Sequence, residues 1–126
     1  MGKNRRRGSK LEDLTAKNYQ KAGYSVEKHV ITNRGEIDII AKWRHKTYAI
    51  EVKSGKQIIT STDIEKIYKK AKHVKAKPVL RHSPRTKITQ PAIKLAKLLN
   101  VSIKPIKIGK KQRKRKKTRK GKRKRK

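Results

Sequence analysis

The chain has no cysteine and no phenylalanine, and only one tryptophan among its 126 residues. Without cysteine it can form neither a disulfide bond nor a thiolate metal site. No apolar run is long enough to span a membrane, and the N-terminus is too polar for a signal peptide. The length fits a single domain. We therefore expect one domain in a cytoplasmic setting, with no membrane partner.

Acidic residues are also scarce, because 8 Asp and Glu stand against 41 Lys and Arg, a formal net charge of +33. The segment 110–126 holds 14 of the basic residues and no acidic one, which leaves a net charge of +19 for the rest. Positive charge at this density repels itself unless a polyanion is bound. Nucleic acid is the expected partner, which implies association with the nucleoid. An anionic membrane surface is the second alternative, although no predicted helix has a suitable apolar face.

Hydrophobic periodicity predicts the element order helix, three strands, helix, strand, helix, strand. We expect a basic, disordered arm over residues 1–8, one folded domain over residues 9–109, and a disordered Lys/Arg-rich tail over residues 110–126. The first helix is expected to begin at Ser9. The sequence thus predicts an α/β fold, with a mixed sheet flanked by helices and with the last helix and strand added at one edge.

Two predicted strands near the middle of the chain place two carboxylates opposite each other. Both strands alternate and are rich in isoleucine, and a polar turn separates them. If the turn is centred between Arg44 and His45, paired residues have numbers that add to 89, so Asp38 faces Glu51. Lys53 then shares a face with Glu51, because side chains alternate along a strand. The apolar residues expected to point into the core are Ile37, Ile39, Ile50 and Val52.

Opposed carboxylates are unusual in a purely structural sheet, because like charges on neighbouring strands repel each other. Two carboxylates about 5 Å apart cost roughly 3 kcal/mol at an effective dielectric constant near 20. A divalent cation removes this penalty, and Mg²⁺ is commonly held by one or two carboxylates together with water and substrate phosphate. The alternative is a solvated face on which Glu51 pairs with Lys53 and Asp38 pairs with a nearby lysine. The pattern alone leaves both interpretations open.

Three short motifs resemble those of known nucleases. Asp38 followed by Glu51-Val52-Lys53 resembles the Asp…Glu-x-Lys motif of the PD-(D/E)XK nuclease superfamily. Gly8-Ser9-Lys10-Leu11-Glu12 resembles the first-helix motif of archaeal-type Holliday junction resolvases, and the similarity extends over residues 8–75. Gly35-Glu36-Ile37-Asp38 instead resembles the GEID segment of a sister group of small RecB-like nucleases. The resolvases carry a small polar residue where this chain has Ile37.

The resemblance implies a restriction-endonuclease-like fold and an endodeoxyribonuclease that cuts four-way (Holliday) junctions as a homodimer, in DNA recombination and repair. It implies that Mg²⁺, or Mn²⁺, is held by Asp38, Glu51 and the main-chain carbonyl of Val52, with Glu12 acting through water. Lys53 would then lie beside the attacking water. Two other functions stay open: a RecB-like nuclease that acts on other DNA structures, and a non-catalytic basic protein that binds nucleic acid.

Glu12 and His29 each have a structural alternative. Glu12 follows Ser9 at the spacing of a helix capping box, so it is expected either to cap the helix or to complete the metal site. His29 is expected to be a surface residue, with a role as ligand or proton carrier as the alternative. The lysine- and isoleucine-rich composition is compatible with a hyperthermophile, in line with the archaeal-type resemblance, although AT-rich coding produces the same bias.

Basic residues outside the tail are the expected contacts with branched double-stranded DNA: Arg5, Arg6, Arg7, Arg34, Lys56, Lys66, Lys69 and Lys70. The last three are expected on the outer face of an amphipathic helix over residues 63–72. The alternative for that face is a solvated charge run with no partner. A later helix has a wide apolar stripe that includes Ile93 and Leu98, and with Trp43 it offers material for a dimer interface.

Overall fold

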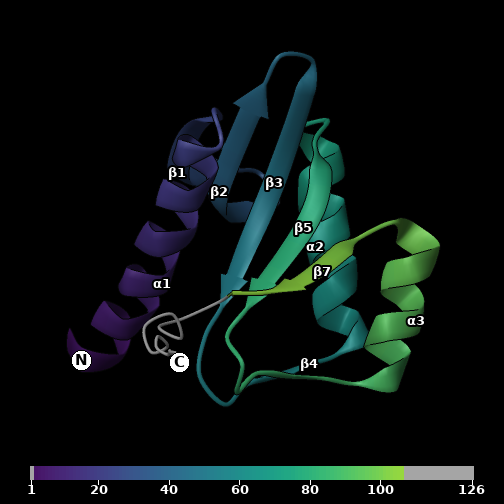
Figure 1. Ribbon diagram of the computed structural model, residues 1–126. Coiled ribbons are helices and arrows are strands. Elements are labelled where there is room, and N and C mark those ends of the chain that lie inside the picture. Colours follow the sequence, from purple (N-terminus) through teal and green to yellow (C-terminus); the bar gives the residue numbers. More distant parts are fainter. Residues whose placement is uncertain (1, 107–126) are drawn as a thin grey trace, which may run out of the picture.

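The computed structural model describes residues 2–106, and for residues 2–9 the backbone alone (Figure 1). The helices are α1 (Gly2–Lys21), α2 (Ser61–His73) and α3 (Gln90–Leu99). The strands are β1 (Ser25–Thr32), β2 (Gly35–Trp43), β3 (Lys46–Lys53), β4 (Ile58–Ile59), β5 (Lys77–His82), β6 (Lys87–Ile88) and β7 (Ser102–Pro105). The tail expected over residues 110–126 lies outside the described residues. Within residues 2–106, no helix is both long enough and apolar enough to cross a membrane.

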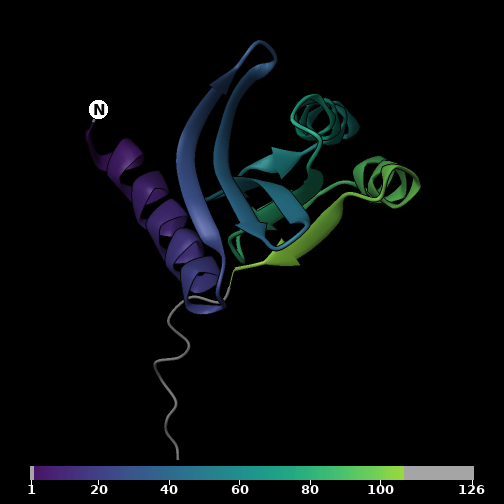
Figure 2. The same cartoon turned by 90° about the horizontal axis from the view of Figure 1, so that it is seen from above.

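Five strands form one mixed sheet in the order β1-β2-β3-β5-β7. Strand β2 runs antiparallel to both β1 and β3, whereas β5 runs parallel to β3 and β7 runs parallel to β5. Figure 2 shows α1 on one side of the sheet and both α2 and α3 on the other. The predicted mixed sheet between helices is therefore confirmed, with α3 and β7 added at one edge.

Apolar residues pack on both faces of the sheet. Ile39 and Ile50 lie in one cluster with Ala16 of α1, whereas Ile37 lies in another with Ala71 of α2. A third cluster joins α2, α3 and β5, and its buried members are Ile59, Ile64, Ile67, Leu80, Ala92, Ala96 and Val101. Because both faces are covered, the central strands carry long apolar runs. The three isoleucines predicted for the core are fully buried, and Val52 is half-buried.

The register of the β2–β3 hairpin is confirmed as predicted. Ile39 pairs with Ile50 and Lys42 pairs with Thr47, so paired numbers add to 89. Arg44 closes the turn in a left-handed conformation, with φ of 57°. The ladder ends at the pair of Ile39 and Ile50, one step before the two carboxylates would face each other. This early end of the ladder shapes the site described below.

Two parts of the predicted organisation are wrong. The first helix begins at Gly2, seven residues before the predicted start at Ser9, so the segment expected to be a disordered arm is helical. Ser9 lies inside α1 and is not its N-cap, which removes the capping-box role considered for Glu12. Arginine and lysine are good helix formers, and no proline interrupts the segment. Two short strands are also absent from the predicted element order: β4 and β6, which pair with each other in a second, two-stranded sheet.

Candidate active site

Where β2 and β3 separate, the side chain of Asp38 takes the place of a main-chain hydrogen-bond acceptor. Beyond the pair of Ile39 and Ile50, the amide of Val52 donates a hydrogen bond to Asp38 Oδ2 at 2.9 Å instead of to a main-chain carbonyl of β2. The alternation of side chains also breaks here, since Ile37 and Ile39 lie in different core clusters. The bond from Val52 therefore fixes the carboxylate of Asp38 at the point of divergence, close to Glu51 on the next strand.

Glu51 is a buried carboxylate, only 6% exposed. The ammonium of Lys70 lies 2.7 Å from its Oε2 atom, yet no residue within 2–106 gives this oxygen a well-directed hydrogen bond. Burial, and then the charge of Asp38, raises the pKa of Glu51. Burial likewise raises the pKa of Asp38, while Val52, Lys53 and Lys70 oppose that shift. The solvated face considered for this position is therefore wrong for Glu51.

Helix α1 brings Glu12 to the same group of charges. His29 of β1 lies between two acidic residues, with Nε2 3.1 Å from Glu12 Oε1 and Nδ1 2.7 Å from Glu36 Oε2. Burial and then the charge of Asp38 raise the pKa of Glu12. The hydrogen bond with Glu36, followed by the charge of Glu12, raises the pKa of His29. The imidazole thus joins the first helix to the start of β2, beside Asp38.

Sequence reasoning gave His29 a role at the site only as an alternative, and it did not place Lys70 there. His29 is half-exposed but bridges two carboxylates from a left-handed backbone conformation, with φ of 53°, which no sequence pattern reveals. Lys70 was expected on the outer face of α2, yet its side chain is 17% exposed and its ammonium also donates to the main-chain carbonyl of Glu36 at 2.9 Å. The available signal was its place beside Ala71 and three residues after Ile67, at the border of the apolar stripe.

The residues present fit a hard divalent cation. Carboxylate oxygens are the ligands that Mg²⁺ and Mn²⁺ prefer. Burial raises the pKa of both Asp38 and Glu51, and the charge of Asp38 adds to the shift at Glu51, so the two carboxyl groups lie near each other in a partly desolvated place. Within residues 2–106, the ammonium of Lys70 is the cationic group that lies beside Glu51 Oε2. Across the described part of the chain, no three His, Asp or Glu side chains converge as metal ligands. Glu12 is therefore not placed as a direct third ligand.

The residues predicted to contact phosphate are spread over several places. Arg34 and Lys69 line one pocket of 260 Å³, together with Lys72 and His73. Lys56 lines another pocket, of 370 Å³, on the loop after β3. Lys66 is exposed on α2. The backbone of Arg5, Arg6 and Arg7 belongs to α1, and their side chains lie outside the described part. Among the residues of this set whose side chains are described, only Lys70 turns inward to the carboxylates.

A protein family matches nearly the whole described chain. The family is described as "Restriction endonuclease" (Mrr_cat), and the match covers residues 4–109. This span includes the four residues predicted to be catalytic: Glu12, Asp38, Glu51 and Lys53. No curated protein matches the sequence.

Three solved structures have a similar fold. A protein of unknown function, AF1548, has a TM-score of 0.64 and 20% identity, covering 75% of this chain and 55% of that one. The EndoMS–dsDNA2 complex has a TM-score of 0.63 and 10% identity, covering 79% and 44%. A repair endonuclease from Pyrococcus abyssi has a TM-score of 0.62 and 10% identity, covering 81% and 46%. The chain thus spans about half the length of these proteins.

The family match and the fold agree with the site. The mixed sheet, with Asp38 on β2 and the Glu51-Val52-Lys53 segment on the adjacent strand β3, is the arrangement expected from the PD-(D/E)XK resemblance. At 10–20% identity the structural matches establish the fold, and the family match over residues 4–109 establishes membership. The chain belongs to the restriction endonuclease family, with a nuclease domain of the PD-(D/E)XK type.

Proposed function

We propose that this chain is a metal-dependent endonuclease that hydrolyses phosphodiester bonds of DNA at the site of Asp38, Glu51 and Lys53. The observation that carries the proposal is the pair of carboxyl groups with raised pKa values at the divergence of β2 and β3. Perturbed titratable groups of this kind gather at catalytic sites. The net charge of +33 adds the attraction for a polyanionic substrate.

Each residue of the site has a distinct task in this mechanism. Asp38 and Glu51, with the main-chain carbonyl of Val52, would hold Mg²⁺ or Mn²⁺. When bound, such an ion polarises the phosphate and lowers the pKa of a bound water. The amide of Val52 keeps Asp38 in a fixed orientation through its hydrogen bond. Lys53, at the end of β3, supplies a compact positive charge for the phosphate oxygens as negative charge develops on them.

Glu12 would act on water rather than as a direct ligand. Its carboxylate lies 3.1 Å from His29, which is in turn fixed by Glu36. A carboxylate with a raised pKa accepts a proton more readily than an ordinary one. Glu12 is therefore suited to orient, and to take a proton from, the water that attacks phosphorus.

We further propose a four-way DNA junction as the substrate and a homodimer as the active form. The support is the resemblance of the segment around Glu12 to archaeal-type resolvases. Each chain has one set of catalytic residues, whereas resolving a junction needs two incisions. A twofold dimer supplies two sites in a fixed relation, and it is the commonest form of oligomer. Leu98 on α3 is 79% exposed and offers an apolar contact for the dimer.

The second candidate is a nuclease that acts on flaps, single strands or duplex ends, as the GEID segment favours. The departure from the resolvases at Ile37 does not decide between the two substrates. Ile37 is fully buried and packs in a cluster with Ala71 of α2, so it has no surface for DNA. The identity of this residue reflects packing against α2, and the choice of substrate must be measured directly.

The decisive experiment compares cleavage of junctions, flaps, single strands and duplex with and without Mg²⁺. Asp38→Asn, Glu51→Gln and Lys53→Ala are each expected to reduce cleavage by at least about 100-fold, as when a transition-state contact is lost. DNA binding in metal-free buffer should persist. Glu27→Gln and Lys42→Ala, on exposed positions of β1 and β2, are the matched controls. Cleavage by Glu51→Gln at the normal rate would rule out this site, and no cleavage of any DNA would favour a non-catalytic DNA-binding protein.

A further inference from the structure

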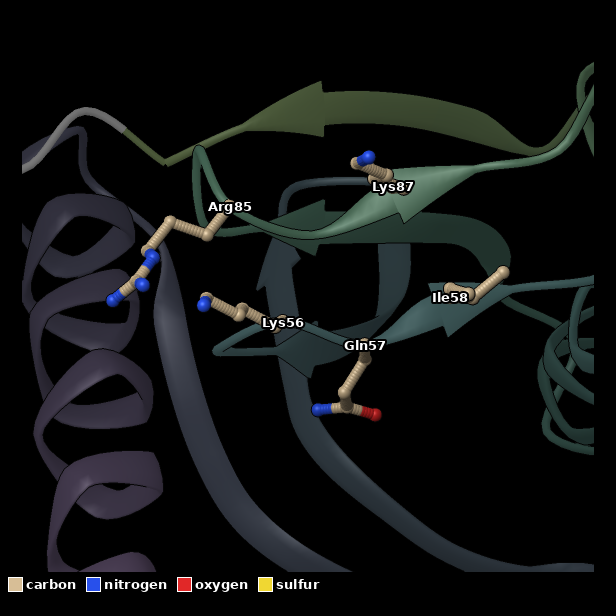
Figure 3. A pocket seen from close by; sticks show the side chains of 5 residues that line it. All are labelled: Lys56, Gln57, Ile58, Arg85 and Lys87. Carbon is tan, nitrogen blue, oxygen red and sulfur yellow. The ribbon is translucent and has the colours of Figure 1, made fainter.

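A second basic pocket lies beyond the end of β3. It has a volume of about 370 Å³ and is lined by Lys56, Gln57, Ile58, Arg85 and Lys87. Three of these five side chains are positively charged and none is negatively charged. Figure 3 shows Lys56 and Arg85 extending in the same direction from two facing loops, one after β3 and one after β5. Ile58 adds an apolar side chain that is 62% exposed.

Buried hydroxyl groups hold these two loops together. Ser83 Oγ lies 2.9 Å from Thr86 Oγ1, and the hydroxyl of Thr86 donates to the carbonyl of Gly55 at 2.8 Å. Both hydroxyl residues are buried. The amide of Lys87 donates to the carbonyl of Gln57 at 2.9 Å, next to the short pairing of β4 with β6. The basic side chains therefore project from a backbone that is already fixed, which lowers the entropic cost of binding a ligand.

The same backbone is tied to the proposed catalytic lysine. The amide of Ser83 donates to the carbonyl of Lys53 at 2.9 Å. Lys56 follows Lys53 by three residues, so their Cα atoms are at most about 11 Å apart. Each strand of duplex DNA carries one phosphate per ~3.4 Å of helix axis. The distance therefore corresponds to a few nucleotides along a bound strand.

In the described part of the chain, the charges of this pocket have no acidic partner. No carboxylate within residues 2–106 forms an ion pair with Lys56, Arg85 or Lys87. Three cations around one hollow repel one another, and an anion between them removes the repulsion. The guanidinium of Arg85 can grip two phosphate oxygens at once, while the ammonium groups act as point charges. The chemistry of the pocket is thus suited to a phosphate group.

We propose that this pocket binds a backbone phosphate of the DNA strand a few nucleotides from the bond that is cut. The inference rests on the proposed function, because the distance is counted from Lys53. Through the bond from Ser83 to Lys53, a phosphate seated here fixes the strand relative to the catalytic residues. A nearby strand end with a terminal phosphate offers the same chemistry as a backbone phosphate, so the experiment must separate these two sources.

The test measures binding without metal, so that it does not depend on cleavage. A set of DNA substrates carries one neutral methylphosphonate each, at successive positions, with or without a 5′-phosphate. Binding is followed by fluorescence anisotropy for wild type and for the double variant Arg85→Gln/Lys87→Gln. A second double variant, Lys94→Gln/Lys97→Gln, removes the same charge from exposed positions of α3. Circular dichroism and thermal unfolding confirm that the variants are folded.

Wild type should bind DNA more weakly when the methylphosphonate lies at one or two adjacent positions a few nucleotides from the cut. The Arg85→Gln/Lys87→Gln variant should no longer respond to a methylphosphonate at those positions, while its response at all other positions stays unchanged. Its slope of log affinity against log salt should fall by about 0.9 for each phosphate released. If the variant instead loses only the contribution of the 5′-phosphate to affinity, the pocket binds a strand end and the backbone assignment is overturned. Equal weakening on every DNA, as with the α3 variant, would overturn the pocket as a phosphate site. If the pocket variant loses its response at one or two methylphosphonate positions but the wild-type protein cuts no DNA, the pocket proposal stands and only the nuclease proposal is refuted.

Discussion

The ammonium of Lys70 lies 2.7 Å from Oε2 of Glu51, and the two side chains are only 17% and 7% exposed. The lysine comes from α2 and the glutamate from β3, so a helix on one face of the sheet supplies a positive charge to the site. A divalent cation held by Glu51 would lie beside the same carboxylate as this ammonium. The ammonium therefore partly neutralises the carboxylates, and it competes with a metal ion for Oε2.

The first prediction concerns stability without metal. Lys70→Met leaves Glu51 and Asp38 buried with less compensating charge, so the free energy of unfolding at pH 7 should fall by about 3 kcal/mol, as when one partner of a buried pair is removed. Urea unfolding in EDTA measures it. Lys69→Met is the matched control, because Lys69 is 57% exposed and 3.8 Å from Glu65; its effect should stay within about 0.5 kcal/mol. Equal effects of the two variants would mean that the pair with Glu51 adds nothing.

The second prediction concerns the affinity for metal. Without Lys70 the site is more negative and Oε2 of Glu51 has no ammonium beside it, so Mn²⁺ should bind about tenfold more tightly, or about 1.4 kcal/mol. Titration calorimetry at pH 8 measures the dissociation constant, and Lys69→Met again serves as control. Weaker binding by Lys70→Met would show instead that the ammonium holds Glu51 in the orientation that the ion requires.

The third prediction concerns pH. Burial raises the pKa of Asp38 above that of the unfolded chain, so its ionised form opposes folding at neutral pH, and this opposition disappears as the pH falls through the raised pKa. In metal-free buffer, Asp38→Asn should raise the urea midpoint at pH 7, and the gain should vanish in acid. Asp13→Asn should instead lower the urea midpoint at pH 7, because the hydrogen bond from Lys28 lowers the pKa of Asp13 and its ionised form therefore favours folding. A midpoint lowered by Asp38→Asn at pH 7 would contradict the burial argument.

Parts of the fold and of the site could be predicted because they depend on local pattern. The register of the β2–β3 hairpin follows from two apolar strands around a polar turn at Arg44, and it was correct. The predicted position of the Lys70 side chain was wrong. Periodicity gives the angle of a residue around a helix, but it does not show how far a long side chain at the border of the apolar face reaches. The early end of the ladder at Ile39 was not predicted, since a side chain that replaces a backbone acceptor leaves no trace in residue spacing.

The fourth prediction concerns His29, which bridges Glu12 and Glu36. His29→Asn keeps a residue that tolerates a left-handed backbone, but its shorter side chain cannot span both carboxylates. The rate constant of cleavage should fall about tenfold, as for residues that orient catalytic ligands, with little change in KM or in metal-free DNA binding. His45→Asn, in the exposed hairpin turn, is the control. An unchanged rate and pH profile would leave His29 only a structural role.

The fifth prediction concerns the homodimer and needs a surface that can be altered without unfolding the chain. Leu98 on α3 is 79% exposed, so Leu98→Glu should leave the thermal unfolding temperature nearly unchanged. If α3 forms the interface, this variant should be monomeric in sedimentation at high salt, where repulsion between basic chains is screened. Lys94→Glu, on the same helix, provides a control for the added charge. A Leu98→Glu protein that dimerises as wild type does would move the interface elsewhere, for example to Trp43 at the hairpin, which is 38% exposed.

Mixing catalytic and inactive chains tests whether the dimer acts as a unit on a junction. When wild type is mixed with an excess of Glu51→Gln, most active sites lie in dimers with one inactive partner. Such dimers should nick one strand of a four-way junction but fail to make the second, symmetrical incision, so nicked junctions accumulate while linear duplex products decline. Wild type alone should yield linear products with few nicked intermediates. If the ratio of nicked to resolved product does not change with the excess of Glu51→Gln, each incision is made by an independent monomer. Together with preferred cutting of flaps or single strands, that outcome would favour the second candidate function over the resolvase.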